Sequence, residues 1–256
     1  MFICLLFLCG SCREHVSRSN SVEFPQALAS KNYTDCYNAA GFFRANKSEI
    51  NSRLPMGFTA QDGSSILGPD YKGYSFLIFI YFSCPSSVGR SFQTTIIATP
   101  IEEPPLTNDL RTVRWNLYEF ARIAGTSTQA EELSNVGLSA QHATLTNTPF
   151  HEGDTVTFFK ATTLDGLLFE VGAKLTDSVN FEAQSHRLWH QRSDGNLVTT
   201  RLDFEYHHSW IGKVNSCSYD AGLLTVADLK GIECTHMGVA EAIESINFTE
   251  HRMLWK

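Results

Sequence analysis

The chain has 256 residues and a formal net charge of −7, and its Lys and Arg residues form no cluster. That charge distribution disfavours nucleic acid and anionic membrane surfaces as main partners. Hydrophobic residues make up 43% of the chain and charged residues 18%, so we expect a folded core in one large domain or two small ones.

An apolar run from Phe2 to Cys9 opens the chain and ends in small residues. It is typical of a signal peptide and is too short to span a bilayer, although no Lys or Arg precedes it. We expect a signal peptide at 1–18, an N-terminal arm at 19–40 and a β-barrel domain at 41–256. An unprocessed apolar N-terminus is the alternative. The mature protein is then expected to have no membrane span and to be extracellular or in the secretory pathway.

Four cysteines lie beyond this leader, namely Cys36, Cys84, Cys217 and Cys234. An even number in an oxidising compartment indicates two disulfides. We expect the pairs Cys36–Cys84 and Cys217–Cys234, because each closes a loop within one part of the chain; free buried thiols are the alternative. No Cys or His spacing is typical of zinc, and we predict no metal and no other cofactor.

Three N-x-S/T sequons begin at Asn32, Asn46 and Asn247. Each is a weak motif alone. Beside a leader and paired cysteines, they predict a glycoprotein that carries these three residues on its surface.

Apolar or alternating segments predict strands in the first half of the chain. They start at Gly41, cover 74–82 with apolar residues on both faces, and continue at 92–99 and 112–123. In the last segment, Trp115, Leu117 and Glu119 fall on one face; a short helix is the alternative there.

Capping signals predict two helices in the same half. Asn46 is expected to begin a short helix that ends at Arg53. Ser127 or Thr128 is expected to begin a longer helix that ends before Gly137.

The stretch from Thr155 to Ser218 alternates polar and apolar residues, and the pairs Asp165-Gly166 and Asp194-Gly195 divide it. Asp-Gly between alternating runs is a strong hairpin signal. We therefore predict an antiparallel meander of four or five strands within a mainly β fold, a single antiparallel β-barrel-like domain with a few flanking helices. Beyond it, 223–229 is expected to form a short strand or helix, and 238–246 a closing helix.

Three segments follow a known pattern and together span most of the chain from Gly41 onward. Residues 41–60 hold a strand, a short helix and a Leu-Pro-x-Gly-Phe segment; residues 114–138 hold a strand and a helix that ends at Gly-Leu; residues 209–224 hold a closing strand and a Ser-rich turn. The set resembles the acetoacetate decarboxylase-like β-barrel superfamily.

The resemblance implies a closed, cone-like antiparallel barrel with a ligand cavity and a few flanking helices. The decarboxylases of the family form a Schiff base with a Lys that a second, adjacent Lys keeps neutral. This chain has no Lys-Lys pair, and the segment from Thr126 to His142 contains no Lys. Decarboxylase activity therefore does not carry over, and no catalytic residue of the family maps onto this chain.

Two histidines and two carboxylates of the meander are the catalytic candidates: His186, His190, Asp203 and Glu205. On strands, the two histidines share one face, and so do the two carboxylates. Pairing of the two strands could bring the four together inside the barrel as an acid–base site. The alternative is a solvated outer face, since such residues usually contact water.

Aromatic residues on the predicted strands are the candidates for ligand binding. They are Trp115, Tyr118, Trp189, Phe204 and Tyr206. Ordinary core packing is the alternative.

The main functional hypothesis is a secreted glycoprotein whose barrel binds a small hydrophobic or amphipathic molecule without catalysis, since common catalytic motifs are absent. The alternative is a small-molecule lyase or hydrolase related to the acetoacetate decarboxylase-like proteins, which uses the histidines and carboxylates of the meander. A structural or interaction module is a third hypothesis that no feature of the sequence favours.

Overall fold

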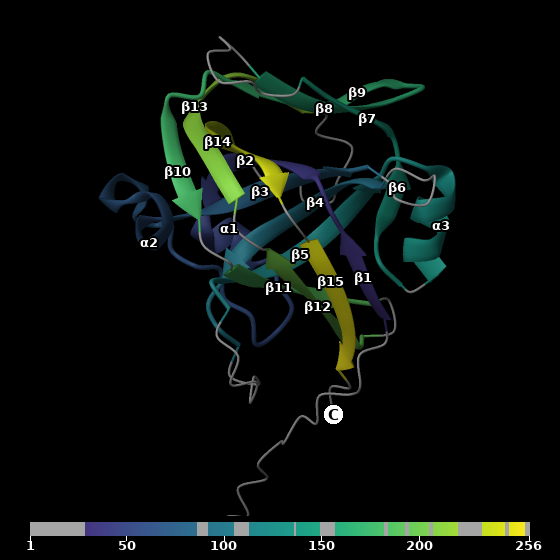
Figure 1. The fold of residues 1–256 in the computed structure, drawn as a ribbon. Coiled ribbons are helices and arrows are strands. Elements are labelled where there is room, and N and C mark those ends of the chain that lie inside the picture. The colour runs from purple at the N-terminus through teal and green to yellow at the C-terminus, as the bar shows by residue number, and fades with distance from the viewer. Residues whose placement is uncertain are drawn as a thin grey trace, which may run out of the picture.

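Strands make up most of the molecule (Figure 1). The computed structural model describes residues 29–85, 92–104, 113–135, 137–148, 157–181, 184–192, 195–204, 207–219, 232–243 and 246–253. These residues form fifteen strands: β1 (Ala29–Tyr33), β2 (Cys36–Asn46), β3 (Tyr74–Cys84), β4 (Phe92–Ile101), β5 (Trp115–Ala124), β6 (Ala140–His142), β7 (Thr144–Thr148), β8 (Thr157–Thr163), β9 (Gly166–Ala173), β10 (Asp177–Phe181), β11 (Gln184–Gln191), β12 (Leu197–Phe204), β13 (His207–Tyr219), β14 (Glu233–Ile243) and β15 (Ile246–Met253). The helices are α1 (Lys47–Asn51), α2 (Ser64–Leu67), the 3-10 turn η1 (Pro69–Tyr71) and α3 (Ser127–Asn135).

The strands form one large sheet in the order β1-β15-β12-β11-β5-β4-β3-β2-β14-β13-β9-β8-β7, with β10 beside β13 and β6 beside β5. The sheet is mixed, because β5 runs parallel to both β11 and β6. Among the described residues, the order has two ends and does not close. The prediction of a mainly β, barrel-like fold is confirmed. The predictions of a closed barrel and of purely antiparallel pairing were wrong.

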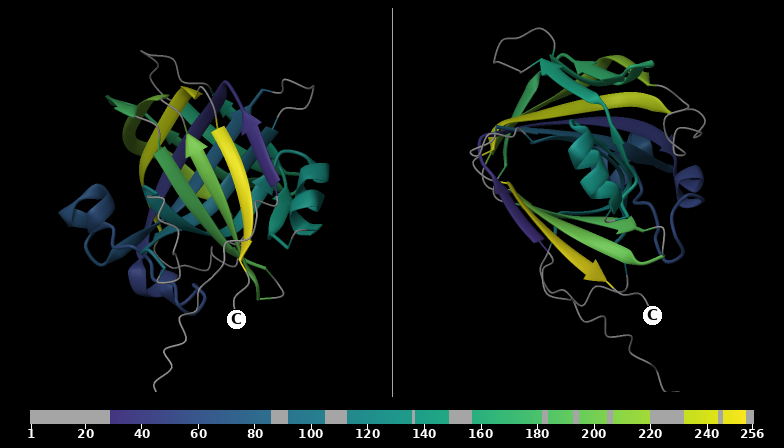
Figure 2. Two further views of the ribbon diagram at one scale, coloured as in Figure 1. Left: turned by 60° about the horizontal axis from the view of Figure 1, so that its bottom comes forward. Right: turned by 90° about the vertical axis from the view of Figure 1, so that its right-hand side faces the viewer.

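The sheet nevertheless curls strongly (Figure 2), and aromatic contacts across it agree with this curvature. Phe42 on β2 and Trp115 on β5 have ring centroids 6.2 Å apart, and Phe82 on β3 stacks on Phe204 of β12 at 6.1 Å. Four strand spacings separate β3 from β12, which in a flat sheet is about 19 Å. Only a sheet that folds over its own face brings these rings together.

Two apolar layers lie on opposite faces of β2–β5. The concave layer fills the curled side with Cys36, Phe42, Phe76, Ile78, Ile80, Phe82, Cys84, Ile96, Ala98, Leu117, Leu188, Leu202 and Phe204. The convex layer lies against β7, β8 and β9 and includes Ala39, Phe43, Leu77, Phe79, Tyr81, Ile97, Ile123, Phe159, Phe169 and Val171. Strand β3 sends alternate side chains into the two layers, which confirms the prediction that it is apolar on both faces.

The predicted hairpins form, but they do not make one meander. Strands β8 and β9 meet at Gly166, where φ is +136°, and β11 and β12 meet at Gly195, where φ is +82°. The first hairpin joins β13, whereas the second lies between β5 and β15. The Asp-Gly signal fixes each hairpin locally, but long-range pairing decides where it is placed, so the predicted meander over Thr155–Ser218 was wrong.

The predicted closing helix at 238–246 was also wrong. Strand β14 runs through most of this segment and pairs with both β13 and β2. Its neighbours on both sides override the helical preference of its Ala and Glu residues. Strands also begin earlier than predicted, because β1 and the first half of β2 lie within the segment 19–40 that we expected to be an arm.

Both helices that capping signals predicted are present. The Asn46 side chain accepts a hydrogen bond from the backbone N–H of Ser48 at 2.9 Å and so caps α1. In α3 the cap is Thr126, whose hydroxyl accepts from the N–H of Gln129 at 3.2 Å, one or two residues earlier than predicted. Gly137 follows α3 with φ +85°, as predicted.

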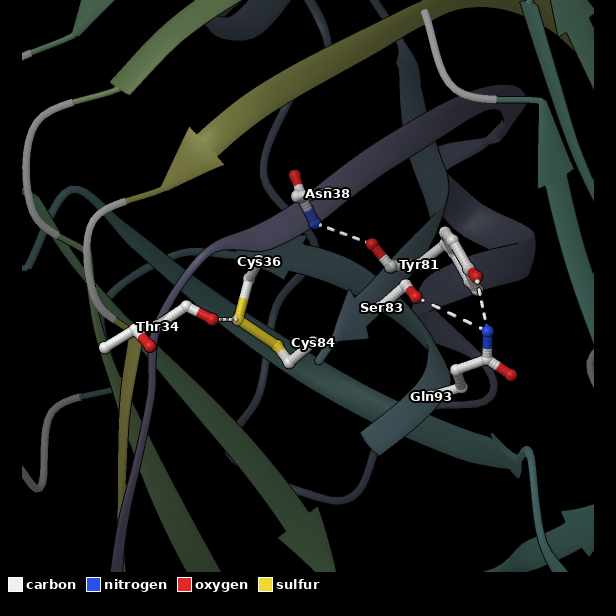
Figure 3. The surroundings of a disulfide bond; sticks show 7 residues. All are labelled: Thr34, Cys36, Asn38, Tyr81, Ser83, Cys84 and Gln93. Carbon is white, nitrogen blue, oxygen red and sulfur yellow. Dashed lines mark hydrogen bonds between the residues drawn. A yellow bond between two sulfur atoms is a disulfide. The ribbon is translucent and has the colours of Figure 1, made fainter. Parts of the chain in front are cut away.

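The structure pairs Cys36 with Cys84 and Cys217 with Cys234, so both predicted disulfides are confirmed. Cys36 and Cys84 are fully buried and join the adjacent strands β2 and β3 (Figure 3). The second bridge connects β13 to β14 and closes the loop between them. The predicted element at 223–229 and the predicted signal peptide at 1–18 lie outside the described residues.

Among the sequons, Asn32 and Asn46 are exposed, and Asn247 lies in β15 opposite Asn32 of β1. Within the described residues, no helix is long and apolar enough to cross a membrane. The same part of the chain contains no group of three or more His, Cys, Asp and Glu residues that could hold a metal ion.

Candidate functional site

Two charged side chains of β5 are buried inside the curled sheet. Glu119 and Arg122 have side chains only 1% and 5% exposed. In a regular strand, residues three apart point to opposite faces. Here the pairing of β5 with β4 slips, because Glu119 lies opposite Ala98 while Ala121 lies opposite Ile97. This bulge leaves Phe120 unpaired and turns both charged residues toward the concave layer.

The two side chains form a bidentate ion pair. Arg122 Nε donates to Glu119 Oε1 at 2.8 Å, and Arg122 Nη2 donates to Oε2 at 2.6 Å. The free energy needed to desolvate two charges is about as large as the free energy gained from their attraction, so such a pair does not by itself stabilise the fold. Burial of a charged pair on a mainly apolar face is therefore a feature that points to a site.

His190 comes from the strand next to the one that carries this pair. Strand β11 runs parallel to β5 with Trp189 opposite Tyr118, so the next residue on each strand is His190 and Glu119. His190 is 6% exposed and alternates with Leu188, a member of the concave layer. Its Nε2 lies 3.0 Å from the Gly137 carbonyl oxygen. Its Nδ1 is buried and has no hydrogen-bond partner in the described part of the chain.

The Gly137 carbonyl comes from the turn between α3 and β6. The turn requires glycine, because φ is +85° and a Cβ atom would lie 2.7 Å from Arg192 Nε. Strand β6 then pairs with β5 so that Ala140 lies opposite Arg122, whose N–H donates to the Ser139 carbonyl at 2.8 Å. The end of α3 thus brings the backbone acceptor for His190 to the strand that carries the ion pair.

The predicted histidines share one face, but the predicted carboxylate lies on the other. His186 lies on the concave side, with ring centroids 5.6 Å from Trp115 and 5.2 Å from Phe204. Asp203 faces away and accepts hydrogen bonds from Ser185 and from Arg201 Nε. Its cross-strand partner is Ser185, whereas that of His186 is Leu202. Glu205 lies outside the described residues, so Glu119 is the carboxylate placed next to His190.

The predicted ligand-binding aromatics divide between two faces. Trp115 and Phe204 line the concave side. Tyr118 and Trp189 pack on the opposite side against Phe58, with centroid distances of 5.4 and 5.6 Å. There the Trp189 indole donates to Asn116 Oδ1 at 3.1 Å, and burial raises the pKa of Tyr118 to about 12. These two form a satellite core, and Tyr206 lies outside the described residues.

Sequence reasoning placed Glu119 on the face of Trp115 and Leu117 but missed Arg122. The available signal was two charges within the apolar segment WNLYEFARIA. Regular alternation assigns those charges to opposite faces, and no feature of the sequence predicts the bulge at Phe120.

No family model matches the sequence, and no curated protein matches it. Several solved structures share the fold. The enduracididine biosynthesis enzyme MppR, complexed with pyruvate, aligns with a TM-score of 0.61 and 14% identity over 88% of this chain and 90% of that one. An acetoacetate decarboxylase-like enzyme from Sphingomonas wittichii RW1 aligns with a TM-score of 0.58 and 12% identity over 89% of this chain and 93% of that one. The acetoacetate decarboxylase of Legionella pneumophila aligns with a TM-score of 0.60 and 10% identity over 98% of each chain.

At these identities the similarity establishes the fold and nothing further. The chain has an acetoacetate decarboxylase-like fold along almost its whole length, as the sequence resemblance implied.

Proposed function

We propose that the protein is an enzyme, a lyase or hydrolase, that acts on a small carbonyl compound with a carboxylate group. The concave site is where it would bind, with Arg122, Glu119 and His190 as the working residues. The observation that carries this proposal is the buried bidentate Glu119–Arg122 pair on a mainly apolar face.

Arginine is the side chain best suited to a buried carboxylate, because its planar guanidinium offers five N–H donors and cannot lose its charge. Glu119 takes two of those donors. An incoming carboxylate would compete with Glu119 for the guanidinium or share it. Either event would change the charge next to His190 upon binding, which suits acid–base chemistry at that residue.

Neighbours in the fold support a small carbonyl acid as substrate. MppR has been solved with pyruvate and with the condensation product of pyruvate and imidazole 4-carboxaldehyde. A Schiff base, in contrast, needs a desolvated lysine. Lys47, Lys72, Lys160, Lys174 and Lys213, the lysines whose side chains the structure describes, are exposed or half-exposed. The proposed chemistry is therefore acid–base catalysis by His190 and Glu119.

A non-catalytic carrier of an amphipathic molecule is the second candidate. The aromatic lining of the concave side favours it, since Phe42 contacts Trp115 and Phe82 contacts Phe204 there. The charged pair would then hold the polar end of the ligand.

Two disulfides are consistent with folding in an oxidising compartment. We further propose that the chain enters the secretory pathway and is glycosylated at Asn32, Asn46 and Asn247. The first two are exposed. Peptide mapping after glycosidase treatment of protein made in a eukaryotic secretory host would test each site.

Calorimetric titration with pyruvate, with a methyl ketone of similar size and with a fatty acid tests the proposed function. Pyruvate should bind and the ketone should not. The double variant Glu119→Leu/Arg122→Met should weaken pyruvate binding at least roughly tenfold, since a hydrogen bond to a charged group contributes about 1.5–3 kcal/mol. The matched control is Lys47→Met/Glu102→Leu, which removes an exposed ion pair of 3.3 Å and should change nothing.

Absence of pyruvate binding, or equal binding by both double variants, would refute the proposal. Saturable binding of the fatty acid alone would favour the carrier. Reduction with borohydride in the presence of pyruvate should leave the protein mass unchanged, and a stable adduct would indicate a Schiff base instead.

A further inference from the structure

The protonation pattern of His190 follows from its one hydrogen bond. A backbone carbonyl can only accept, so Nε2, which lies 3.0 Å from the Gly137 oxygen, must carry the hydrogen. In the neutral ring Nδ1 is then a bare acceptor. That atom is buried without a partner in the described part of the chain, although buried polar atoms almost always have one.

The concave face on which His190 lies also carries charged and titratable side chains. His190 is on the concave face, next in register to Glu119, and Arg122 extends from the same strand as Glu119. His186 occupies the same face four residues away. The acceptor therefore belongs to the same face as the group that would bind a carboxylate.

The Gly137 carbonyl holds the ring in this tautomer. Its position depends on a backbone conformation that only glycine adopts readily and on close approach of the Arg192 side chain. A base that must present one particular nitrogen to a ligand needs such an anchor on the other nitrogen.

We infer that His190 Nδ1 is the proton acceptor of the concave site, and that its ligand is a 2-oxo acid with a hydrogen on the carbon next to the carbonyl. This inference rests on the proposed function. Nδ1 takes that proton; the C–H electron pair becomes the carbon–carbon double bond of an enolate, and the carbonyl electron pair moves to oxygen. Return of a proton from the imidazolium to the carbon reverses the step.

Exchange of the pyruvate methyl hydrogens in D₂O, followed by proton NMR, tests the inference. The wild-type protein should accelerate exchange over buffer at the same pH. His190→Asn keeps an acceptor oxygen at the δ position but cannot take a proton. It should bind pyruvate with nearly unchanged affinity and lower the exchange rate roughly 10²–10⁴-fold, the usual contribution of a general base. His190→Gln, which keeps a donor for Gly137, should lose exchange as well.

Nitrogen-15 NMR of the histidines in the unliganded protein gives an independent readout that does not depend on a variant that folds. His190 should show a protonated Nε2 and a bare Nδ1 that shifts when pyruvate is added. Pyruvate binding without exchange, undiminished exchange in His190→Asn, or a protonated Nδ1 in the neutral ring would each overturn the inference and leave the proposed function standing. Failure of the wild type to bind pyruvate would refute the proposed function instead.

Discussion

The convex and concave layers lie on opposite faces of the same four strands but bury different chemistry. On the convex side, Leu77, Phe79, Ile97 and Ile123 pack against the apolar face of β7–β9. On the concave side, the same strands bury a Glu and an Arg, with a His on the strand beside them. Apolar burial stabilises a fold at about 25 cal/mol per Å², whereas buried charge does not. Both layers are apolar cores, but among the described residues only the concave one also contains groups that can react.

The largest effect is expected on the convex side. Phe159 is fully buried and lies 5.9 Å from Tyr81 and 5.7 Å from Phe169, measured between ring centroids. Phe159→Ala should lower the free energy of unfolding by about 3–5 kcal/mol in urea titrations and leave pyruvate binding unchanged. Phe158→Ala, on the other face of β8, should cost under about 1 kcal/mol. Equal losses for both variants would mean that this layer is not the stabilising one.

A comparable loss is expected when only half of the concave ion pair is removed. Arg122→Met leaves Glu119 buried without its partner and should cost about 3–5 kcal/mol of unfolding free energy. The double variant Glu119→Leu/Arg122→Met should regain that loss and can exceed the wild type by about 1–4 kcal/mol. Urea denaturation of all three proteins measures this. A double variant less stable than the single one would show that the ion pair stabilises the fold, which would contradict the proposed difference between the two layers.

The disulfide between β13 and β14 should affect stability alone. It closes a loop with a sequence separation of 17, so its loss in Cys217→Ser/Cys234→Ser should lower the unfolding free energy by about 3 kcal/mol in the chain-entropy model. Pyruvate affinity should stay the same, because neither cysteine lies on β5 or β11. A change in affinity at full folding would extend the site to β13 and β14.

The smallest effect is expected for His236 of β14. Burial first, and then the charge of Lys213, lower the pKa of its imidazole below the ordinary 6.5. The unfolded chain therefore binds a proton more readily than the folded one, and stability falls as pH drops below about 6.5. His236→Gln should flatten this part of the stability curve between about pH 8 and about pH 5. If the variant has the same dependence of unfolding free energy on pH as the wild type, other groups cause the loss of stability at acid pH.

Elements governed by local chemistry were predictable from the sequence. Asn46 caps α1, Gly137 ends α3, and both Asp-Gly turns form hairpins, because each depends on a few neighbouring residues. Strand β3 was evident because a run apolar on both faces needs cover on both sides. Placement of the second hairpin beside β5 was not evident, since it depends on pairing between strands about seventy residues apart.

The candidate site was only partly predictable for the same reason. His186 and His190 share a face by simple alternation. Asp203 was assigned to them without knowledge of the register, and the structure turns it toward Ser185. Arg122 joins Glu119 only through the bulge, which is a property of how β5 meets β4 and not of either strand alone.

The placement of β14 has a consequence for how the chain is made. Thr235 donates a hydrogen bond to the Phe42 carbonyl across a sequence separation of 193, and β2 has no partner on that side until β14 arrives. A growing chain on the ribosome therefore carries β2 with an open edge until β14 has been made, and loop-closure entropy makes this pairing slow. Open edges are where nascent chains associate with one another. A chain that terminates before β14 would therefore leave β2, a central strand of the complete sheet, as an unpaired edge to which other chains can bind.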